Sequence, residues 1–238
     1  MQYLLRRKIA ILFTGIIFYG TSSFGQLNNV VNQPDHDDKP YHFGINLGVN
    51  YSHFSFTHHP EFLQRDTIMD VESINSPGLN LALLVNIRLG EHWDLRLHPA
   101  DLTFSEKSFL YTENFGDAPT IKKSIQSITV SFPVHLKFSS DRINNFKVYT
   151  IGGVKFDYDL ASNAGAKKAE ELIKLKKSDF SAELGVGFHF YFPVFVLTPE
   201  IKVSSGLVNL HSRDENLRYS NVIDKINSKM ITFSLTVE

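Results

Sequence analysis

The chain has no cysteine among its 238 residues, so it holds no disulfide and cannot use a thiol as a nucleophile. It also lacks an excess of positive charge, because 24 Lys and Arg residues stand against 25 Asp and Glu residues. That balance argues against a nucleic-acid partner. No apolar stretch of the sequence is long enough to be a transmembrane helix, and the longest one lies near the N-terminus.

The single long apolar run, Ile9 to Tyr19, follows the cationic group Arg6-Arg7-Lys8 and precedes a small-x-small site at Ser23-Phe24-Gly25. These are the three parts of a secretion signal. A retained membrane anchor is the alternative, but the run is too short to span a bilayer. We therefore expect residues 1–25 to be removed as a signal peptide. An exported chain without disulfides then needs a good core or a closed cylinder of hydrogen bonds.

Residues 26–40 are polar and bounded by proline, which predicts a flexible periplasmic lead-in. Within them, His36-Asp37-Asp38 offers side chains that bind metal ions, although a solvated segment explains these residues more simply. We therefore expect no metal site and no cofactor in this segment.

The remainder of the chain alternates between apolar and polar residues. Over residues 41–51 every odd position is apolar and every even position is His, Gly or Asn. A period of two is typical of a β-strand with one apolar and one polar face. The pattern predicts eight strands, at residues 41–54, 78–89, 92–104, 124–138, 146–159, 179–192, 194–208 and 228–237. In the third of these the apolar positions change parity near Pro99, which predicts a β-bulge.

Most of these stretches reach the roughly 9–11 residues that a tilted strand needs to cross a bilayer. Short connections such as Gly90-Glu91 alternate with much longer ones, as in outer-membrane barrels. We predict an all-β fold, an eight-stranded antiparallel outer-membrane β-barrel over residues 41–238, with both termini in the periplasm. The outward residues that should face lipid include Phe43, Leu83, Val130, Phe188 and Phe233.

An eight-stranded barrel is too narrow for an open pore, so inward side chains must fill it. Both signs of charge point inward, which favours a network of ion pairs because an unpaired charge there would be costly. A catalytic or metal site is the alternative, since His98, His135 and Asp94 lie on adjacent strands. No Ser beside a His and an acid stands out at one height, so we expect no catalytic residue. The lumen-facing polar candidates are Arg88, Asp94, Arg96, His98, His135, Lys137, Lys155, Asp157, Glu183, Glu200 and Lys202.

The connection that precedes residue 179 carries a cluster of lysines. Contact with anionic lipopolysaccharide or with a partner protein is one interpretation, and a solvated loop is the simpler one. The candidate partner-contact residues are Lys167, Lys168, Lys174, Lys176 and Lys177.

The order and spacing of several stretches are more specific than a generic barrel pattern. These stretches are Gly44 to Phe54, Asp66-Thr67-Ile68, Ser76 to Leu97, Phe132 to Ser140, Arg142 to Ser162, Ser178 to Gly206 and Ile226 to Glu238. Together they resemble the PorT family of Bacteroidetes, called SprT in gliding bacteria, whose members are outer-membrane components of the type IX secretion system. The resemblance covers nearly all of the mature chain.

The resemblance implies a non-enzymatic role in exporting cargo with C-terminal sorting signals, such as proteases, adhesins or gliding proteins. It implies other type IX components and the outer-membrane bilayer as partners, and no cofactor or small-molecule substrate. Two alternatives remain: an outer-membrane enzyme that modifies lipid A or cleaves peptides, and a passive OmpA-like envelope barrel. A Ser-His-acid set at one barrel height would favour the enzyme, and loss of cargo secretion on deletion would favour the secretion role.

Overall fold

The computed structural model describes residues 30–58, 68–113, 120–161, 175–212 and 223–238. The chain divides into two units, Met1–Val31 and Asn32–Glu238, and the fold below belongs to the second unit. The expected signal peptide at residues 1–25 lies outside the described residues. In the described part of the chain, no helix is long and apolar enough to cross a membrane.

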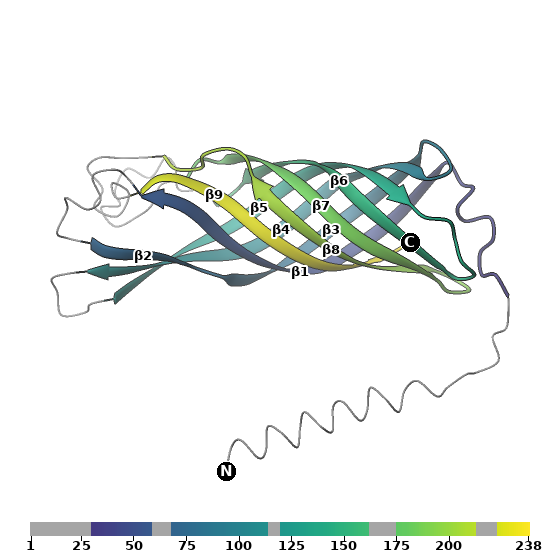
Figure 1. Cartoon of the computed structure of the whole chain (residues 1–238), viewed down its shortest axis with the longest axis horizontal. Helices are drawn as coiled ribbons and strands as arrows, with labels where there is room; N and C mark the ends of the chain where they lie inside the picture. Colours follow the sequence, from purple (N-terminus) through teal and green to yellow (C-terminus); the bar gives the residue numbers. More distant parts are fainter. Residues whose placement is uncertain (1–29, 59–67, 114–119, 162–174, 213–222) are drawn as a thin grey trace, which may run out of the picture. The chain divides into compact units, whose positions relative to one another are not determined.

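The second unit is built from antiparallel strands that follow one another around a barrel (Figure 1). The strands are β1 (Tyr41–His58), β2 (Ile68–Ile74), β3 (Ser76–Arg88), β4 (Trp93–Glu113), β5 (Thr120–Ser139), β6 (Phe146–Asp159), β7 (Ser178–Tyr191), β8 (Val196–Gly206) and β9 (Ile223–Val237). Both β2 and β3 pair with β4 and are separated only by Asn75, so together they act as one strand of the wall.

Two pairings close the wall, and one of them joins strands that are distant in sequence. The first strand pairs with the last, with Ile45 opposite Val237, and β4 pairs with β5, with Trp93 opposite Phe138. The sheet order runs β2-β4-β3-β1-β9-β8-β7-β6-β5, and the β4–β5 pairing joins its ends. The predicted closed, eight-stranded antiparallel barrel is therefore confirmed.

Several strands extend farther than the alternation predicted, always away from the short turns. β1 runs to His58, β4 to Glu113, and β5 begins at Thr120. All of β2 was missed, because it falls in a stretch that we expected to be a connection. Outside a hydrocarbon layer both faces of a strand meet water, so the apolar and polar alternation fades while backbone pairing continues. The connections 59–67 and 114–119 are correspondingly shorter than expected.

The register of β4 contains the predicted bulge. Leu83 of β3 pairs with Ala100, whereas Val85, two residues later, pairs with Leu97. On the other side of β4 the register also shifts between Leu97 and Asp101. Because β4 has one extra residue here, even-numbered residues point inward before the bulge and odd-numbered residues point inward after it. As a result His98 and Asp101 are both buried inside the barrel although they are three residues apart.

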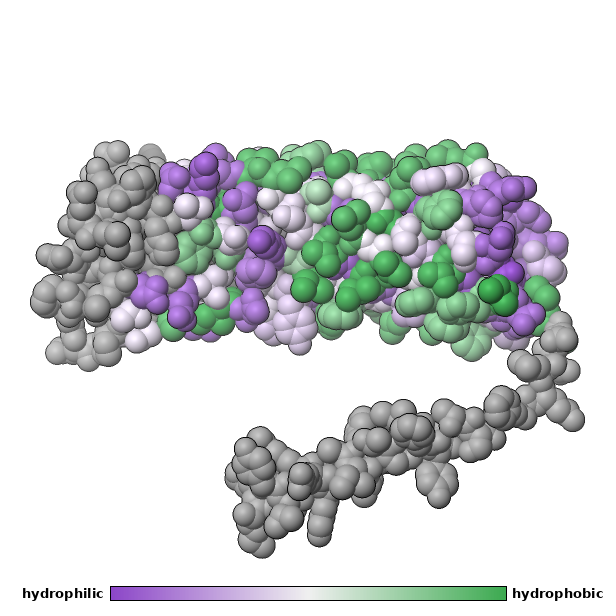
Figure 2. Space-filling model, viewed as in Figure 1, coloured by the Kyte–Doolittle hydropathy of each residue, from purple (hydrophilic) through white to green (hydrophobic). Residues whose placement is uncertain are grey.

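The outer surface of the wall is apolar over most of its height. Phe43 is 64% exposed and Phe233 is 48% exposed, and Leu83 and Phe188 are also exposed, as predicted. Val130 lies on the same outward face and is half-buried. On the face that Figure 2 shows, hydrophobic residues gather over the middle of the barrel, and hydrophilic residues gather at one end and beside the grey residues at the other. An apolar surface this extensive is suited to acyl chains and not to water.

The outer surface generates a first prediction. Phe233 sits in the centre of the apolar outward row of β9, beside Val49 and Ile201. Replacing it by lysine places a charge in hydrocarbon, so Phe233→Lys should lower the free energy of unfolding by about 2–4 kcal/mol. The measurement is denaturant unfolding of the refolded protein in lipid vesicles.

Thr57→Lys is the matched control, because Thr57 is exposed on β1 near its end, away from the apolar band. Its cost should stay within about 1 kcal/mol. Equal losses for the two variants would contradict the lipid-facing orientation of β9.

Candidate functional site

The interior of the barrel is crossed by a buried ion pair between opposite sides of the wall. Arg96 on β4 donates through Nη1 to the carboxylate of Glu200 on β8, and both side chains are almost fully buried. Four steps separate these strands in either direction around the sheet, so the pair spans the lumen. Tyr149 on β6 donates its hydroxyl to the same carboxylate at 2.5 Å, and Arg96 Nε donates to Asn86 Oδ1 at 2.9 Å. We call Arg96, Tyr149 and Glu200 the cross-lumen cluster.

The ring of Tyr149 reaches this position because its neighbour on β7 is glycine. Tyr149 pairs with Gly187 in the register of β6 and β7. A Cβ atom at Gly187 would lie 2.2 Å from the Tyr149 ring, so any other residue would displace the ring. The absence of a side chain at Gly187 therefore leaves the space that the Tyr149 ring occupies inside the barrel.

A second group of buried charges lies on β5, β6 and β7. Nε2 of His135 is 2.7 Å from Glu183 Oε2, and Lys155 Nζ is 3.3 Å from Glu183 Oε1. Lys155 is also 3.3 Å from Asp157, whose other carboxylate oxygen accepts a hydrogen bond from Ser131 at 2.5 Å. Opposite charges thus balance within a few ångströms, as a water-poor interior requires.

The remaining lumen-facing candidates find separate partners. Lys137 Nζ is 3.0 Å from Asp94 Oδ2, and Lys202 Nζ is 3.8 Å from Glu200 Oε1. Arg88 pairs with Asp38 at 2.9 Å, outside the lumen and partly exposed. Of the predicted set, the buried members are Arg96, His98, His135, Lys137, Lys155, Glu183, Glu200 and Lys202. Arg88, Asp94 and Asp157 keep part of their side chains exposed.

The grouping of His98, His135 and Asp94 that we considered for catalysis does not form as a unit. His98 and His135 do meet edge to face, with ring centroids 5.8 Å apart. Asp94 instead pairs with Lys137, and the carboxylate beside His98 belongs to Asp101, at 3.9 Å from His98 Nδ1. Sequence reasoning missed Asp101, because its inward orientation depends on the bulge in β4.

A small cavity lies inside the barrel toward the end that carries the longer connections. The cavity measures about 40 Å³, with Lys155 and Asp157 in its lining and the apolar side chains of Phe54, Leu175 and Leu210 around it. Such a volume holds water but no organic substrate.

Two of the candidate partner-contact lysines are described. Lys176 and Lys177 are exposed, and Lys176 Nζ donates to the carbonyl of Asn209 at 3.0 Å. Lys167, Lys168 and Lys174 lie outside the described residues.

The end of the barrel with the short turns is covered by residues Asn32–Pro40, which we call the end plug. The backbone N–H of Asn32 donates to Asn145 Oδ1 at 2.8 Å, and the hydroxyl of Tyr191 donates to Asp37 at 2.7 Å. Arg88 anchors the plug through Asp38. This arrangement differs from the flexible lead-in that we expected over residues 26–40, of which residues 26–29 lie outside the described part of the chain. The polar groups of the plug find partners on the barrel that lie 50 to 159 residues away in sequence.

The carboxylate of Asp37 in the end plug is surrounded by His36, Lys147 and Tyr191. Burial by itself would raise the pKa of its carboxyl, but His36, Tyr191 and the charge of Lys147 outweigh burial and hold that pKa well below its ordinary value. A lowered folded-state pKa means that the charged form is favoured by folding. The contact therefore stabilises the plug at neutral pH and is lost only as the pH falls through that lowered value.

Comparisons with known proteins agree with this architecture. A family model described as "Outer membrane protein beta-barrel domain" matches residues 24–212, which is most of the chain. No curated protein sequence matches the chain significantly.

The solved structures that resemble this chain include bacterial surface and outer membrane proteins with low sequence identity. Neisserial surface protein A shares 9% identity with a TM-score of 0.44, over 84% of this chain and 99% of that one. The outer membrane protein OprG of Pseudomonas aeruginosa shares 10% identity with a TM-score of 0.42, over 82% and 92%. The attachment invasion locus protein Ail of Yersinia pestis shares 14% identity with a TM-score of 0.37, over 84% and 98%.

The cross-lumen cluster generates a second prediction. Glu200→Gln removes the charge that balances Arg96 while it keeps the volume of the side chain. An uncompensated buried guanidinium should lower the free energy of unfolding by about 3–5 kcal/mol. The double variant Arg96→Leu/Glu200→Leu should recover part of that loss, because it leaves no unpaired charge.

The control for this prediction is Arg88→Ala, which removes a partly exposed pair with Asp38 and should cost no more than about 1 kcal/mol. All three variants are compared by denaturant unfolding in the same vesicles. If Glu200→Gln cost no more than Arg88→Ala, the lumen would be hydrated enough to screen its charges.

Proposed function

The chain belongs to the family of outer membrane protein beta-barrel domains, and on this premise we propose that it is a non-enzymatic component of the type IX secretion system. In this proposal the barrel supports export of cargo that carries C-terminal sorting signals. The support is the resemblance of its strands to the PorT family, above all the stretches Gly44 to Phe54 and Ser178 to Gly206.

The observation that carries the non-enzymatic part is the ion pair across the lumen. Arg96 and Glu200 meet from opposite strands, and Tyr149 fills the space beside them. Interior cavities of about 40 Å³ and 30 Å³ lie on either side of this level. Ligand pockets in proteins usually measure about 300–1,000 Å³. In the part of the barrel that the structure describes, these side chains leave no path for a cargo chain and no interior room for an organic substrate.

The surfaces left for a secretion role are the two ends of the barrel. In the proposal the end plug and the short turns face the periplasm, and the longer connections face outward, as in other outer-membrane barrels. Lys176 and Lys177 then belong to the outer side, where a partner protein or lipopolysaccharide would meet them. The barrel thus serves as a fixed membrane platform for neighbouring secretion components.

The proposal is tested in the bacterium that encodes the chain. Deleting the gene should trap sorting-signal cargo in the periplasm, and restoring the wild-type gene should return the cargo to the medium. Restoring the gene as His98→Ala should return it equally well, because the proposed mechanism uses no interior chemistry. The measurements are an immunoblot of the barrel in outer membranes and an assay of secreted cargo.

Two results would contradict the proposal in different ways. Unchanged secretion after deletion would identify the protein as a passive envelope barrel. Loss of secretion in His98→Ala at a normal barrel level would require a chemical role inside the lumen, as in an outer-membrane enzyme.

A further inference from the structure

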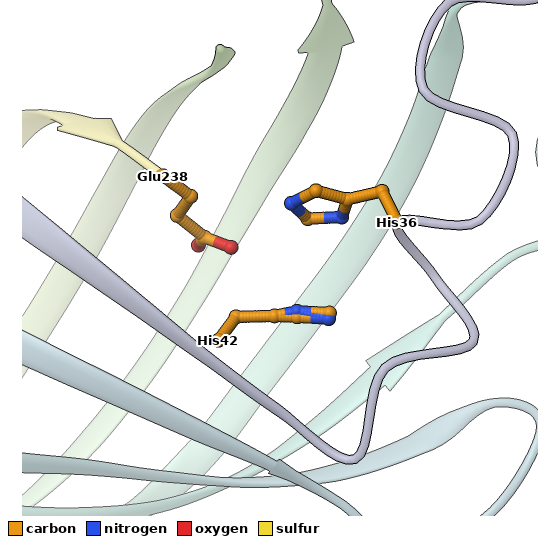
Figure 3. Close-up of side chains that lie close together, drawn as sticks. All are labelled: His36, His42 and Glu238. Carbon is orange, nitrogen blue, oxygen red and sulfur yellow. The ribbon is translucent and has the colours of Figure 1, made fainter.

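Three metal-ligating side chains converge at the end of the barrel that the end plug covers (Figure 3). His36 comes from the plug, His42 is the second residue of β1, and Glu238 follows the last residue of β9. One ligand atom from each of the three side chains lies within 4.8 Å of the other two. The group therefore joins the segment before the barrel to both the first and the last strand of its wall.

The rings of His36 and His42 lie close together, and each has a nitrogen atom without a hydrogen bond. Their ring centroids are 4.3 Å apart and their planes are inclined by 65°. The Nδ1 atoms of His36 and His42 are both buried, and neither has a hydrogen-bond partner among the described residues, although the Asp37 carboxylate lies 3.8 Å from His36 Nδ1. A buried polar atom without a partner is costly, and a metal ion bound to a neutral imidazole nitrogen would satisfy it.

The carboxylate of Glu238 is held in place at this position. Asn86 Nδ2 donates to Glu238 Oε1 at 3.1 Å, and the backbone of Glu238 exchanges two 3.0 Å hydrogen bonds with Val196. A ligand whose orientation is fixed by a hydrogen bond binds a metal ion better than a freely rotating one. The site is thus partly preorganised on the wall, with His36 as the ligand supplied by the plug.

The surrounding charges leave the Glu238 carboxylate available to a cation. Lys137 pairs with Asp94, Arg88 pairs with Asp38, and Lys147 lies 3.7 Å from Asp37. Among the described residues, Glu238 forms no ion pair within 4.0 Å. The cavity that these residues line measures about 30 Å³, which accommodates an ion and a bound water.

We propose that His36, His42 and Glu238 form a binding site for one divalent transition-metal ion, with Zn²⁺ as the best match, which fastens the end plug to the barrel. Two imidazoles and one carboxylate are a recurrent zinc donor set that leaves a fourth position for water. Zinc binds these atoms at about 2.0–2.2 Å, so small side-chain rotations bring the three atoms onto one ion. Hard cations such as Mg²⁺ and Ca²⁺ prefer oxygen ligands and fit this set poorly.

The test uses the full mature protein, refolded in detergent without a polyhistidine tag and stripped of metal with a chelator. Titration calorimetry with ZnCl₂ should show one Zn²⁺ bound per chain. The affinity should fall by about tenfold or more in His42→Ala and in Glu238→Gln. The glutamine variant keeps an oxygen that accepts from Asn86 and loses only the charge. Co²⁺ should give visible absorption bands of a low-coordinate site in the wild type, and these bands should be lost in His42→Ala.

His92→Ala is the matched control, because His92 lies in the short turn at the same end, 4.0 Å from Asp141 and outside the group. It should bind Zn²⁺ as the wild type does. Gel mobility with and without heating establishes that each variant is folded before titration. Absence of Zn²⁺ binding by the wild type at millimolar concentration, or equal binding by the wild type and His42→Ala, would overturn the proposal.

Discussion

The antiparallel pairing of β4 with β5 joins the ends of the sheet and converts it into a barrel. In hydrocarbon each unpaired backbone N–H or C=O group costs several kcal/mol, so a sheet with open edges would not persist there. Closure permits the outward row of apolar residues to meet lipid while all inward residues share one enclosed space. The number of strands then sets the width of that space, and eight strands leave a space narrow enough for side chains to fill.

The narrow interior explains why its charges occur in close pairs. A single charge in an enclosed, water-poor space would be costly, and each buried cation found there has an acidic partner. Arg96 meets Glu200 from the opposite side of the barrel, and Lys155 lies between Glu183 and Asp157. These contacts fill the lumen and tie together strands that do not neighbour each other in the sheet. They favour a rigid barrel whose contacts with other molecules are made at its two ends, where the end plug and the connections lie.

Much of this fold follows from the sequence, because alternation reports directly which side of a strand faces lipid. Odd residues of β1 from Tyr41 to Tyr51 and even residues of β7 from Phe180 to Phe190 are apolar, and the structure places them outward. Lys155, Glu183 and Glu200 alternate with the apolar residues of their own strands, and the sequence therefore placed them inward. Tyr149 is an odd residue of β6, as are the inward residues Lys147 and Lys155. The alternation therefore also predicts that Tyr149 points inward, but an aromatic ring is not an obvious lumen residue, and we did not include it.

The partners of these side chains were not readable from the sequence. Parity gives the face of a residue but not its height, and the height depends on the register between strands. The bulge in β4 was visible from Pro99, yet its effect of bringing Asp101 beside His98 needed the register. The end plug has no periodicity, so nothing local linked Asp37 to Tyr191, which lies 154 residues later.

The central claim is that paired side chains close the lumen, and a current measurement tests it most directly. The refolded protein is inserted into planar lipid bilayers, and the current is recorded under an applied voltage in concentrated salt. A lumen filled by Arg96, Tyr149 and Glu200 should give no stable conducting state above the bare bilayer. Long-lived open steps of the size that water-filled porins produce would contradict the account, since ions would then have a continuous aqueous path through the barrel.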